Sequence, residues 1–315
     1  MKVFLKKFII ISILVYSINL IIGALIITSD KSQVWTDFYE SKRIDIALTG
    51  SSHCAFGINP KVIEEITTYQ TFNLSSPAQS PKTAFFIISE IINRFKPKII
   101  VQDLFFLTFF PENQFLNCMI PFSQIKYSKN YLKNWRSNIS IVEKGMSFFP
   151  VYFYKKSIVT KIKSIFRFTF FKSNDSEDTI YYKGYKGFNE KVSIRALSDA
   201  NIFNNQFNFN KINREQVEYL IKTVKLCDQN NVKLIWISVP IPKASLAKIA
   251  NYADINEKIS DLARKNNVVY IDYNLTAKPI FVDLNDFKDD NHLNVNGGLK
   301  ISTDIAKRIK SNDWN

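Results

Sequence analysis

Short apolar runs alternate with amphipathic stretches along most of the chain, and this alternation restricts the fold more than any other feature of its 315 residues. The apolar runs are continuous, which is typical of strands buried on both faces of a parallel sheet. Strand–helix repetition of this kind predicts an α/β fold in which ligands bind beyond the carboxyl ends of the strands. The expected strands cover 44–50, 69–75, 98–106, 232–240 and 268–273, and the expected helices cover 59–66, 81–96, 213–231, 245–267 and 294–310.

Residues 107–212 interrupt this pattern, and we expect them to form a mainly helical insertion. Between Lys126 and Lys172 there are eleven basic residues, one acid and twelve aromatic residues. Within this stretch, 155–168 places isoleucine and phenylalanine at helical spacing with lysine and arginine between them, as in a helix that lies on an anionic membrane surface. An ordinary helical insertion with a solvated basic face fits the same residues, so both interpretations stay open.

The first thirty residues contain an uncharged apolar run of 21 residues, Phe8–Thr28, preceded by three lysines. The run is long enough to span a bilayer as a helix and longer than the apolar part of a secretory signal, and Ile26-Ile27 is a poor cleavage site. We therefore expect 1–29 to be a cytoplasmic stub and an uncleaved transmembrane anchor, and 30–43 to be a polar linker. The domain at 44–311 would lie outside a bacterial cytoplasmic membrane, because the lysines hold the N-terminus inside.

Composition identifies no partner by itself. The net charge is +14, but the abundance of lysine, asparagine and isoleucine can reflect genome base composition. Nucleic acid is not expected as a partner of a domain outside the cytoplasm. The three cysteines lie far apart without a CxxC motif, so neither a disulfide framework nor a zinc site is expected.

A serine pair follows the first expected strand, in the stretch Gly50-Ser51-Ser52-His53. A serine between a strand and a helix lies where backbone N–H groups and the helix dipole stabilise negative charge, which suits a nucleophile and the oxyanion that it generates. Alternatively, both serines cap the turn or the next helix. His53 has no acid at a useful offset, and Cys54 fits a small buried residue better than a thiol nucleophile.

The second histidine, His292, follows the last expected strand in a polar loop. Asp289 precedes it by three positions, a spacing at which a carboxylate can bond one ring nitrogen and leave the other for a serine. Asp286 and Asp290 flank this acid, and the sequence leaves open which of the three orients His292. The pattern predicts that Ser52, His292 and a carboxylate meet at one end of the sheet.

Together the two segments resemble the SGNH/GDSL hydrolase superfamily. Gly50-Ser51-Ser52 matches the family's Gly-Asp-Ser motif, and Asp289-Asp290-Asn291-His292 matches its late Asp-x-x-His motif. The resemblance implies a flavodoxin-like three-layer α/β/α sandwich with Ser52 as nucleophile, His292 as general base and Asp289 as orienting acid. Serine at position 51 resembles the membrane-tethered branch that includes the teichoic acid D-alanylation and alginate O-acetylation proteins. The resemblance covers roughly residues 44–106 and 213–311.

The resemblance is incomplete at the oxyanion hole. The family supplies donors from the serine N–H, from a glycine after the second strand and from an asparagine after the third. This chain has Asn73-Leu74-Ser75-Ser76-Pro77 and Gln102-Asp103-Leu104 at the latter two places. We expect the Ser52 N–H to act as a donor, with Asn73 and the Ser75 amide as candidate substitutes, although an ordinary turn fits them too. Loss of one such donor costs about 3–4 kcal/mol of transition-state stabilisation.

These features predict a membrane-anchored extracytoplasmic serine esterase or O-acyltransferase that needs no cofactor and acts on acyl esters, acetyl first among them, of cell-envelope polysaccharide. Its expected partners are the membrane, the polysaccharide or its lipid carrier, and a membrane-embedded acyl donor protein. The alternative is a catalytically inactive SGNH-like scaffold that binds envelope glycan or a membrane acyltransferase. A lipase would require an apolar acyl groove beside Ser52.

Overall fold

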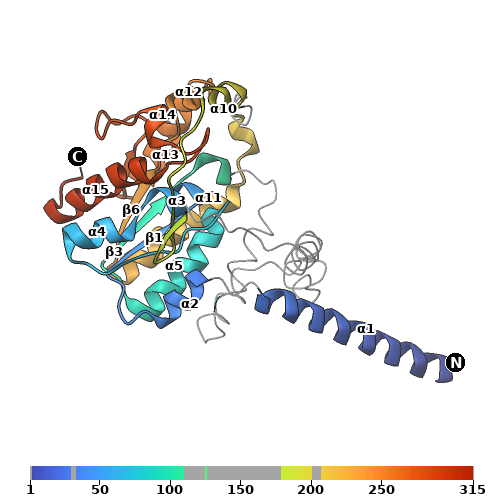
Figure 1. Cartoon of the computed structure of the whole chain (residues 1–315). Coiled ribbons are helices and arrows are strands. Elements are labelled where there is room, and N and C mark those ends of the chain that lie inside the picture. Colours follow the sequence, from blue (N-terminus) through green and yellow to red (C-terminus); the bar gives the residue numbers. More distant parts are fainter. Residues whose placement is uncertain (1, 30–32, 110–124, 126–178, 201–206, 315) are drawn as a thin grey trace. The chain divides into compact units, whose positions relative to one another are not determined.

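The computed structural model describes residues 2–29, 33–109, 125, 179–200 and 207–314 (Figure 1). The chain divides into two compact units. Helix α1 belongs to one unit, and the remaining described elements belong to the other.

The second unit is built on a five-stranded parallel sheet in the order β2-β1-β3-β6-β7. Counted along the chain, this is the strand order 2-1-3-4-5 of flavodoxin-like folds, so the predicted α/β sandwich is confirmed. The interior strands β1, β3 and β6 are buried along nearly their whole length, as their largely apolar sequences require. The strands are β1 (Ile46–Thr49), β2 (Thr71–Asn73), β3 (Ile99–Asp103), β6 (Lys233–Ser238) and β7 (Val269–Asp272).

Helices cover both faces of this sheet (Figure 1). Helices α4 (Pro60–Thr67) and α15 (Val295–Ser311) pack on each other, as do α5 (Pro81–Phe95) and α11 (Arg214–Gln229). Local sequence sets their ends: α5, for example, begins after the cap Ser80 with proline in its first turn and ends at Lys96 in the left-handed conformation. The single helix expected at 245–267 is instead two helices, α12 (Lys243–Leu246) and α13 (Tyr252–Lys265).

The interval expected to be a polar linker contains helix α2 (Gln33–Glu40). Trp35 and Phe38 are buried in it, and Arg94 Nη2 donates a 2.7 Å hydrogen bond to the Tyr39 carbonyl. Aromatic residues three and four positions apart form an apolar stripe on one helix face, and this stripe outweighs the polar residues between them. The linker prediction is therefore wrong for residues 33–40.

The described part of the insertion contains an antiparallel hairpin, β4 (Thr179–Tyr182) and β5 (Tyr185–Phe188), which the sequence did not predict, whereas most residues of the expected helical insertion lie outside the described residues. Its turn caps the edge of the sheet, because Asn73 N–H of β2 donates a 3.0 Å hydrogen bond to the Lys183 carbonyl. Gly184 has φ +87°, and a β-carbon there would overlap the Asn73 carbonyl. Among the described residues of this region, there are also three short elements: η1 (Phe106–Phe109), α10 (Ile194–Asp199) and η2 (Phe209–Lys211).

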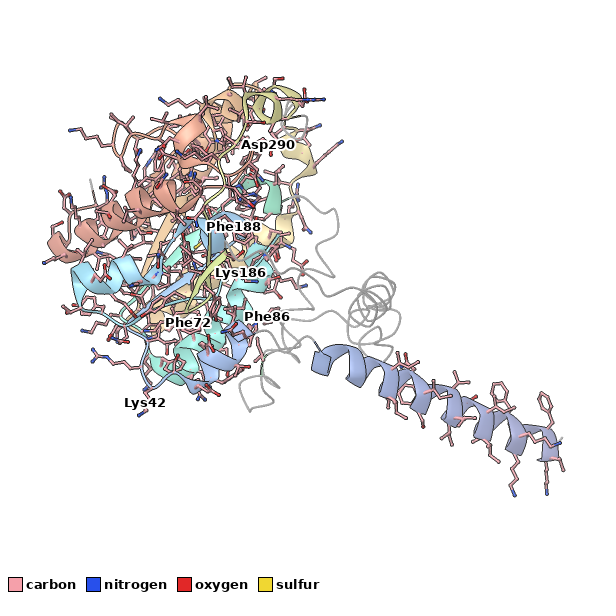
Figure 2. The ribbon with its side chains drawn as sticks, viewed as in Figure 1. Lys42, Phe72, Phe86, Lys186, Phe188 and Asp290 are labelled. Carbon is pink, nitrogen blue, oxygen red and sulfur yellow. The ribbon has the colours of Figure 1, made fainter. Side chains whose placement is uncertain are left out.

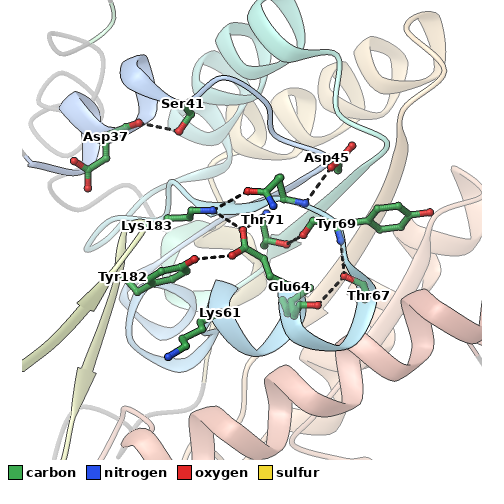
Figure 3. A network of polar contacts seen from close by, with 12 residues as sticks. Asp37, Ser41, Asp45, Lys61, Glu64, Thr67, Tyr69, Thr71, Tyr182 and Lys183 are labelled. Carbon is green, nitrogen blue, oxygen red and sulfur yellow. Dashed lines mark hydrogen bonds and ion pairs between the residues drawn. The ribbon is translucent and has the colours of Figure 1, made fainter.

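Polar contacts fasten the hairpin to α4 (Figure 3). Glu64 accepts hydrogen bonds from Tyr182 Oη at 2.7 Å and from Lys183 Nζ at 2.6 Å. The same carboxylate accepts from the Thr71 N–H at the start of β2. The basic aromatic stretch 126–172, including the expected surface helix at 155–168, lies outside the described residues.

Helix α1 (Lys2–Ser29) has a 21-residue segment, Lys2–Ile22, with a mean hydropathy of 2.0 and no buried residues. By length and composition this helix can cross a membrane. An uncleaved anchor and a signal sequence both have these properties.

Candidate active site

A tight turn after β1 places two adjacent serines in different roles. Gly50 adopts φ +138°, a conformation open to glycine, and the chain then enters α3 (Ser52–Gly57). Ser51 is the N-cap of α3, and its Oγ accepts a hydrogen bond from the His53 N–H at 3.2 Å. Ser52 is the first helical residue and is half-buried, so its hydroxyl is left for another partner. The nucleophile and cap interpretations of this stretch therefore apply to different serines.

Ser52, His292 and Asp289 form a continuous hydrogen-bonded chain. Ser52 Oγ lies 2.9 Å from His292 Nε2, and His292 Nδ1 lies 3.1 and 3.0 Å from the two Asp289 carboxylate oxygens. An ionised carboxylate only accepts hydrogen bonds, so Nδ1 carries the imidazole hydrogen and Nε2 accepts from the serine hydroxyl. The structure thus brings together three residues that span 240 positions of the sequence, in the arrangement of a nucleophile, a base and an orienting acid.

The loop between α14 (Asp283–Asp286) and α15 holds Asp289 in place. The backbone N–H groups of Asn291 and His292 donate to its Oδ1 at 2.8 and 2.6 Å. Burial alone would raise the pKa of Asp289, but the hydrogen bonds and positive charge that His292 supplies, with those two N–H groups, outweigh it. The pKa of this carboxyl therefore lies well below its usual range, and Asp289 is ionised at neutral pH.

Two of the neighbouring acids, Asp283 and Asp286, have other partners. Asp286 is fully buried and pairs with Lys300 Nζ at 2.6 Å, and it also accepts from the Val282 N–H. Asp283 accepts from the Lys243 and Ala244 N–H groups at the start of α12. Burial, followed by the charge of Asp289, raises the pKa of Asp290. Of the three acids that the sequence left open, the structure places Asp289 against the imidazole.

Two of the three expected oxyanion donors are engaged elsewhere. Asn73 is fully buried, and its Nδ2 donates to the carbonyls of Cys54 and Ile58 at 2.9 and 3.0 Å. The Ser75 N–H donates to Asn73 Oδ1 at 3.0 Å. Both residues therefore hold the turn after β2 instead of offering free donors. Ser52 is the first residue of α3, where the N–H groups have no acceptor within the helix, so its N–H is the one expected donor that fits an oxyanion here.

Aromatic side chains surround the triad, and the sequence did not identify them. The Phe56 ring lies edge-on to His292 with centroids 5.2 Å apart, and Phe188 of the hairpin, which is labelled in Figure 2, packs on Phe56 at 5.2 Å. Lys288 Nζ lies 4.2 Å from the Phe188 ring centroid and 3.3 Å from Asp289 Oδ2. The sequence could have indicated Lys288 as a residue of the site, because it directly precedes Asp289. It could not have indicated Phe188, because the hairpin that carries Phe188 was not predicted.

A buried carboxylate, Asp103, anchors the nucleophile turn from beneath. Asp103 Oδ2 accepts from Ser51 Oγ at 2.7 Å and from the Ser51 N–H at 3.2 Å, and Oδ1 accepts from the Val239 N–H. Burial raises the pKa of Asp103 to about 6, against the hydrogen bonds from Ser51 and Val239 that lower it. Cys54, beside the turn, is also fully buried, and burial raises the pKa of its thiol, which excludes a ready thiolate.

The raised pKa of Asp103 predicts a pH-dependent contribution to stability. The folded state keeps this proton up to about pH 6 and the unfolded chain loses it near 3.8, so stability from this group falls as the pH rises through that window. Across this window, the contribution of Asp103 to the free energy of unfolding falls by about 3 kcal/mol. Comparing unfolding free energies of the wild type and Asp103→Asn at pH 4 and pH 7 should show the difference shifting by about that amount in favour of the variant. A pH-independent difference would contradict the prediction.

Comparison with known proteins is limited to structures. No family model and no curated protein matches the chain. A "putative acylhydrolase" from Bacteroides fragilis is similar with 9% sequence identity and a TM-score of 0.41, over 89% of this chain and 95% of that one. A GDSL-like lipase from Bacteroides thetaiotaomicron is similar with 10% identity and a TM-score of 0.40, over 90% and 98%. The chemistry assigned to this chain therefore rests on its own strand order and side-chain geometry.

Proposed function

We propose that the protein is a serine esterase or O-acyltransferase of the SGNH/GDSL type. The observation that carries the proposal is the continuous chain from Ser52 Oγ through His292 to the ionised Asp289. A hydroxyl, an imidazole and a carboxylate in this order activate the hydroxyl as a nucleophile toward acyl groups. Ser52, His292 and Asp289 are each half-buried and not enclosed, so a substrate can reach them.

The reaction proceeds in two steps on this geometry. Ser52 Oγ attacks the carbonyl carbon of an acyl ester while His292 Nε2 takes the hydroxyl proton, and Asp289 stabilises the imidazolium. The Ser52 N–H faces the developing oxyanion. Collapse breaks the ester C–O bond, and His292 returns the proton to the departing alcohol. Water or a sugar hydroxyl then attacks the acyl-enzyme with the same base, releasing the acid or a new ester and restoring Ser52.

We further propose that the acyl group is acetyl and that the substrate is cell-envelope polysaccharide or its lipid carrier. Support comes from the apolar helix α1, which would hold the domain at the outer side of the bacterial cytoplasmic membrane with the N-terminus inside. The excess of basic and aromatic residues between Lys126 and Lys172 fits contact with an anionic membrane. A membrane-embedded acyl donor protein is the natural source of acetyl groups for a tethered enzyme of this kind.

A specific observation favours a second function, that of an inactive scaffold. Two of the expected oxyanion donors, Asn73 and the Ser75 N–H, already donate hydrogen bonds to other acceptors of the protein. A fold that kept the triad but lost the second donor would bind envelope glycan or a membrane acyltransferase without turning over rapidly. The intact bond between Ser52 and His292 favours the enzyme, because a scaffold gains nothing from it.

A fluorophosphonate probe tests the proposal on the full-length chain in detergent. The probe should label Ser52, located by peptide mass spectrometry, and Ser52→Ala should abolish labelling. Release of acetate from envelope polysaccharide, compared between the wild type and the same variant, then tests the substrate. Labelling that persists in Ser52→Ala would refute the nucleophile, and an unlabelled wild type would support the scaffold.

A further inference from the structure

Both histidines of the chain lie side by side in the site. The His292 and His53 rings have centroids 4.8 Å apart, although only His292 contacts the proposed nucleophile. His53 is 1% exposed, whereas the triad residues remain half-buried. A second imidazole this close, and in no step of the mechanism, needs an explanation.

Each ring nitrogen of His53 has a partner on a different part of the site. Nδ1 lies 3.0 Å from Ser51 Oγ, on the turn that presents Ser52. Nε2 lies 2.8 Å from Asn291 Oδ1, in the loop that presents His292. Both partners are themselves fixed, because Ser51 is bonded to Asp103 and the Asn291 N–H is bonded to Asp289.

We infer that His53 is a positioning residue that joins the nucleophile turn to the acid–base loop, in parallel with the bond between Ser52 and His292. Ser51 directly precedes Ser52, and Asn291 directly precedes His292, so the link sets the spacing of the two reacting side chains. The kinetic consequence of this link rests on the proposed function. The buried hydrogen bonds of this link hold the two loops at a fixed separation before the substrate binds. The reacting side chains are therefore already in position for the reaction.

The protonation state of His53 fits this role. Burial, and then the positive charge of His292, lowers the pKa of His53 to about 3, so the ring is neutral at working pH and has one donor and one acceptor. Nε2–H donates to Asn291 Oδ1, and Nδ1 accepts from the Ser51 hydroxyl, which is shared between the ring and Asp103 Oδ2. A neutral ring also adds no charge beside the base.

Packing on His53 is separable from its hydrogen bonds. The Phe105 ring lies against the imidazole, with centroids 3.8 Å apart. Phe105→Leu removes this ring contact and leaves both His53 hydrogen bonds. His53→Gln keeps an amide near the position of Nε2 and hence the bond to Asn291, while His53→Asn keeps one near Nδ1. These variants form a matched set around His53→Phe, which fills the space without bonding.

The test is the rate of fluorophosphonate labelling of Ser52 in the full-length chain. His53→Phe and Asn291→Leu should each lower the rate about tenfold, the effect of losing one buried hydrogen bond and stranding its partner. The double variant should lose no more than either single variant, because both remove one link. His53→Gln and Phe105→Leu should label close to the wild-type rate, and His53→Asn should behave like His53→Phe.

Three results would overturn the inference: His53→Phe labelling at the wild-type rate, Phe105→Leu losing as much as His53→Phe, or the double variant losing the product of the two single effects. An unlabelled wild type would instead refute the proposed function. Hydrogen–deuterium exchange then decides the link by itself. The N–H groups of Asn291 and His292 should exchange faster in His53→Phe and at the wild-type rate in His53→Gln, and equal exchange in all three proteins would refute the link.

Discussion

His292→Ala is expected to slow the proposed acyl transfer by about 10⁴- to 10⁶-fold, because removal of the proposed base leaves the Ser52 hydroxyl without a proton acceptor. Ser52 Oγ contacts His292 Nε2, and the nearby His53 already has partners for both ring nitrogens. The remaining activity would come from binding and from the Ser52 N–H. The rate of fluorophosphonate labelling, and of ester hydrolysis where a substrate is found, measures the effect.

Asp290→Asn is the matched control for this experiment. Asp290 lies in the same loop, and its backbone carbonyl accepts a hydrogen bond from Ser245 Oγ. The variant changes a charge two residues from His292 and leaves the triad intact, so labelling should stay within about threefold of wild type, as for a rearranged surface charge. Equal losses in both variants would mean that loop charge, rather than the imidazole, controls the reaction.

Gly50→Ala is expected to destabilise the fold by about 3–5 kcal/mol, the sum of backbone strain and overpacking. Gly50 has φ +138°, and an added β-carbon would lie 2.5 Å from the Asp103 β-carbon and 3.0 Å from its carbonyl oxygen. To relieve this overlap, the turn would have to shift, which would move Ser51 away from Asp103 and misplace Ser52. Thermal unfolding of the full-length protein, together with the labelling rate, measures both consequences.

Gly57→Ala provides the comparison, because it adds the same atom at the other end of α3. The nearest atom would be Leu293 Cδ1 at 3.0 Å, the tip of a flexible side chain, and the backbone there is not in the left-handed region. We expect a loss of about 1 kcal/mol or less, partly offset by the better helix propensity of alanine. If Gly50→Ala proved as mild as Gly57→Ala, the turn would not depend on glycine.

The sheet and the triad were predictable because their signals are local. Continuous apolar runs mark the five strands, and the three-residue spacing of Asp289 and His292 suits a carboxylate that reaches back to an imidazole. The meeting of Ser52 with His292 follows from strand order, since both segments lie beyond carboxyl strand ends.

Other features depend on contacts between distant segments. The β4–β5 hairpin is short and stands at the sheet edge, fastened by Asn73, Glu64 and Asp37 from other elements. The sequence of 179–188 does not indicate which distant residues the hairpin will contact. The oxyanion candidates failed for a similar reason: the sequence shows that Asn73 has donors but not that the Cys54 and Ile58 carbonyls already take them.

Every imidazole in this chain lies within the site, since His53 and His292 are its two histidines. Protein grown with nitrogen-15 histidine as its sole labelled residue would therefore give ring resonances from this site alone. One substitution assigns both rings. The spectrum would read out the tautomer beside Ser52 and the tautomer beside Asn291 separately, with no substrate added.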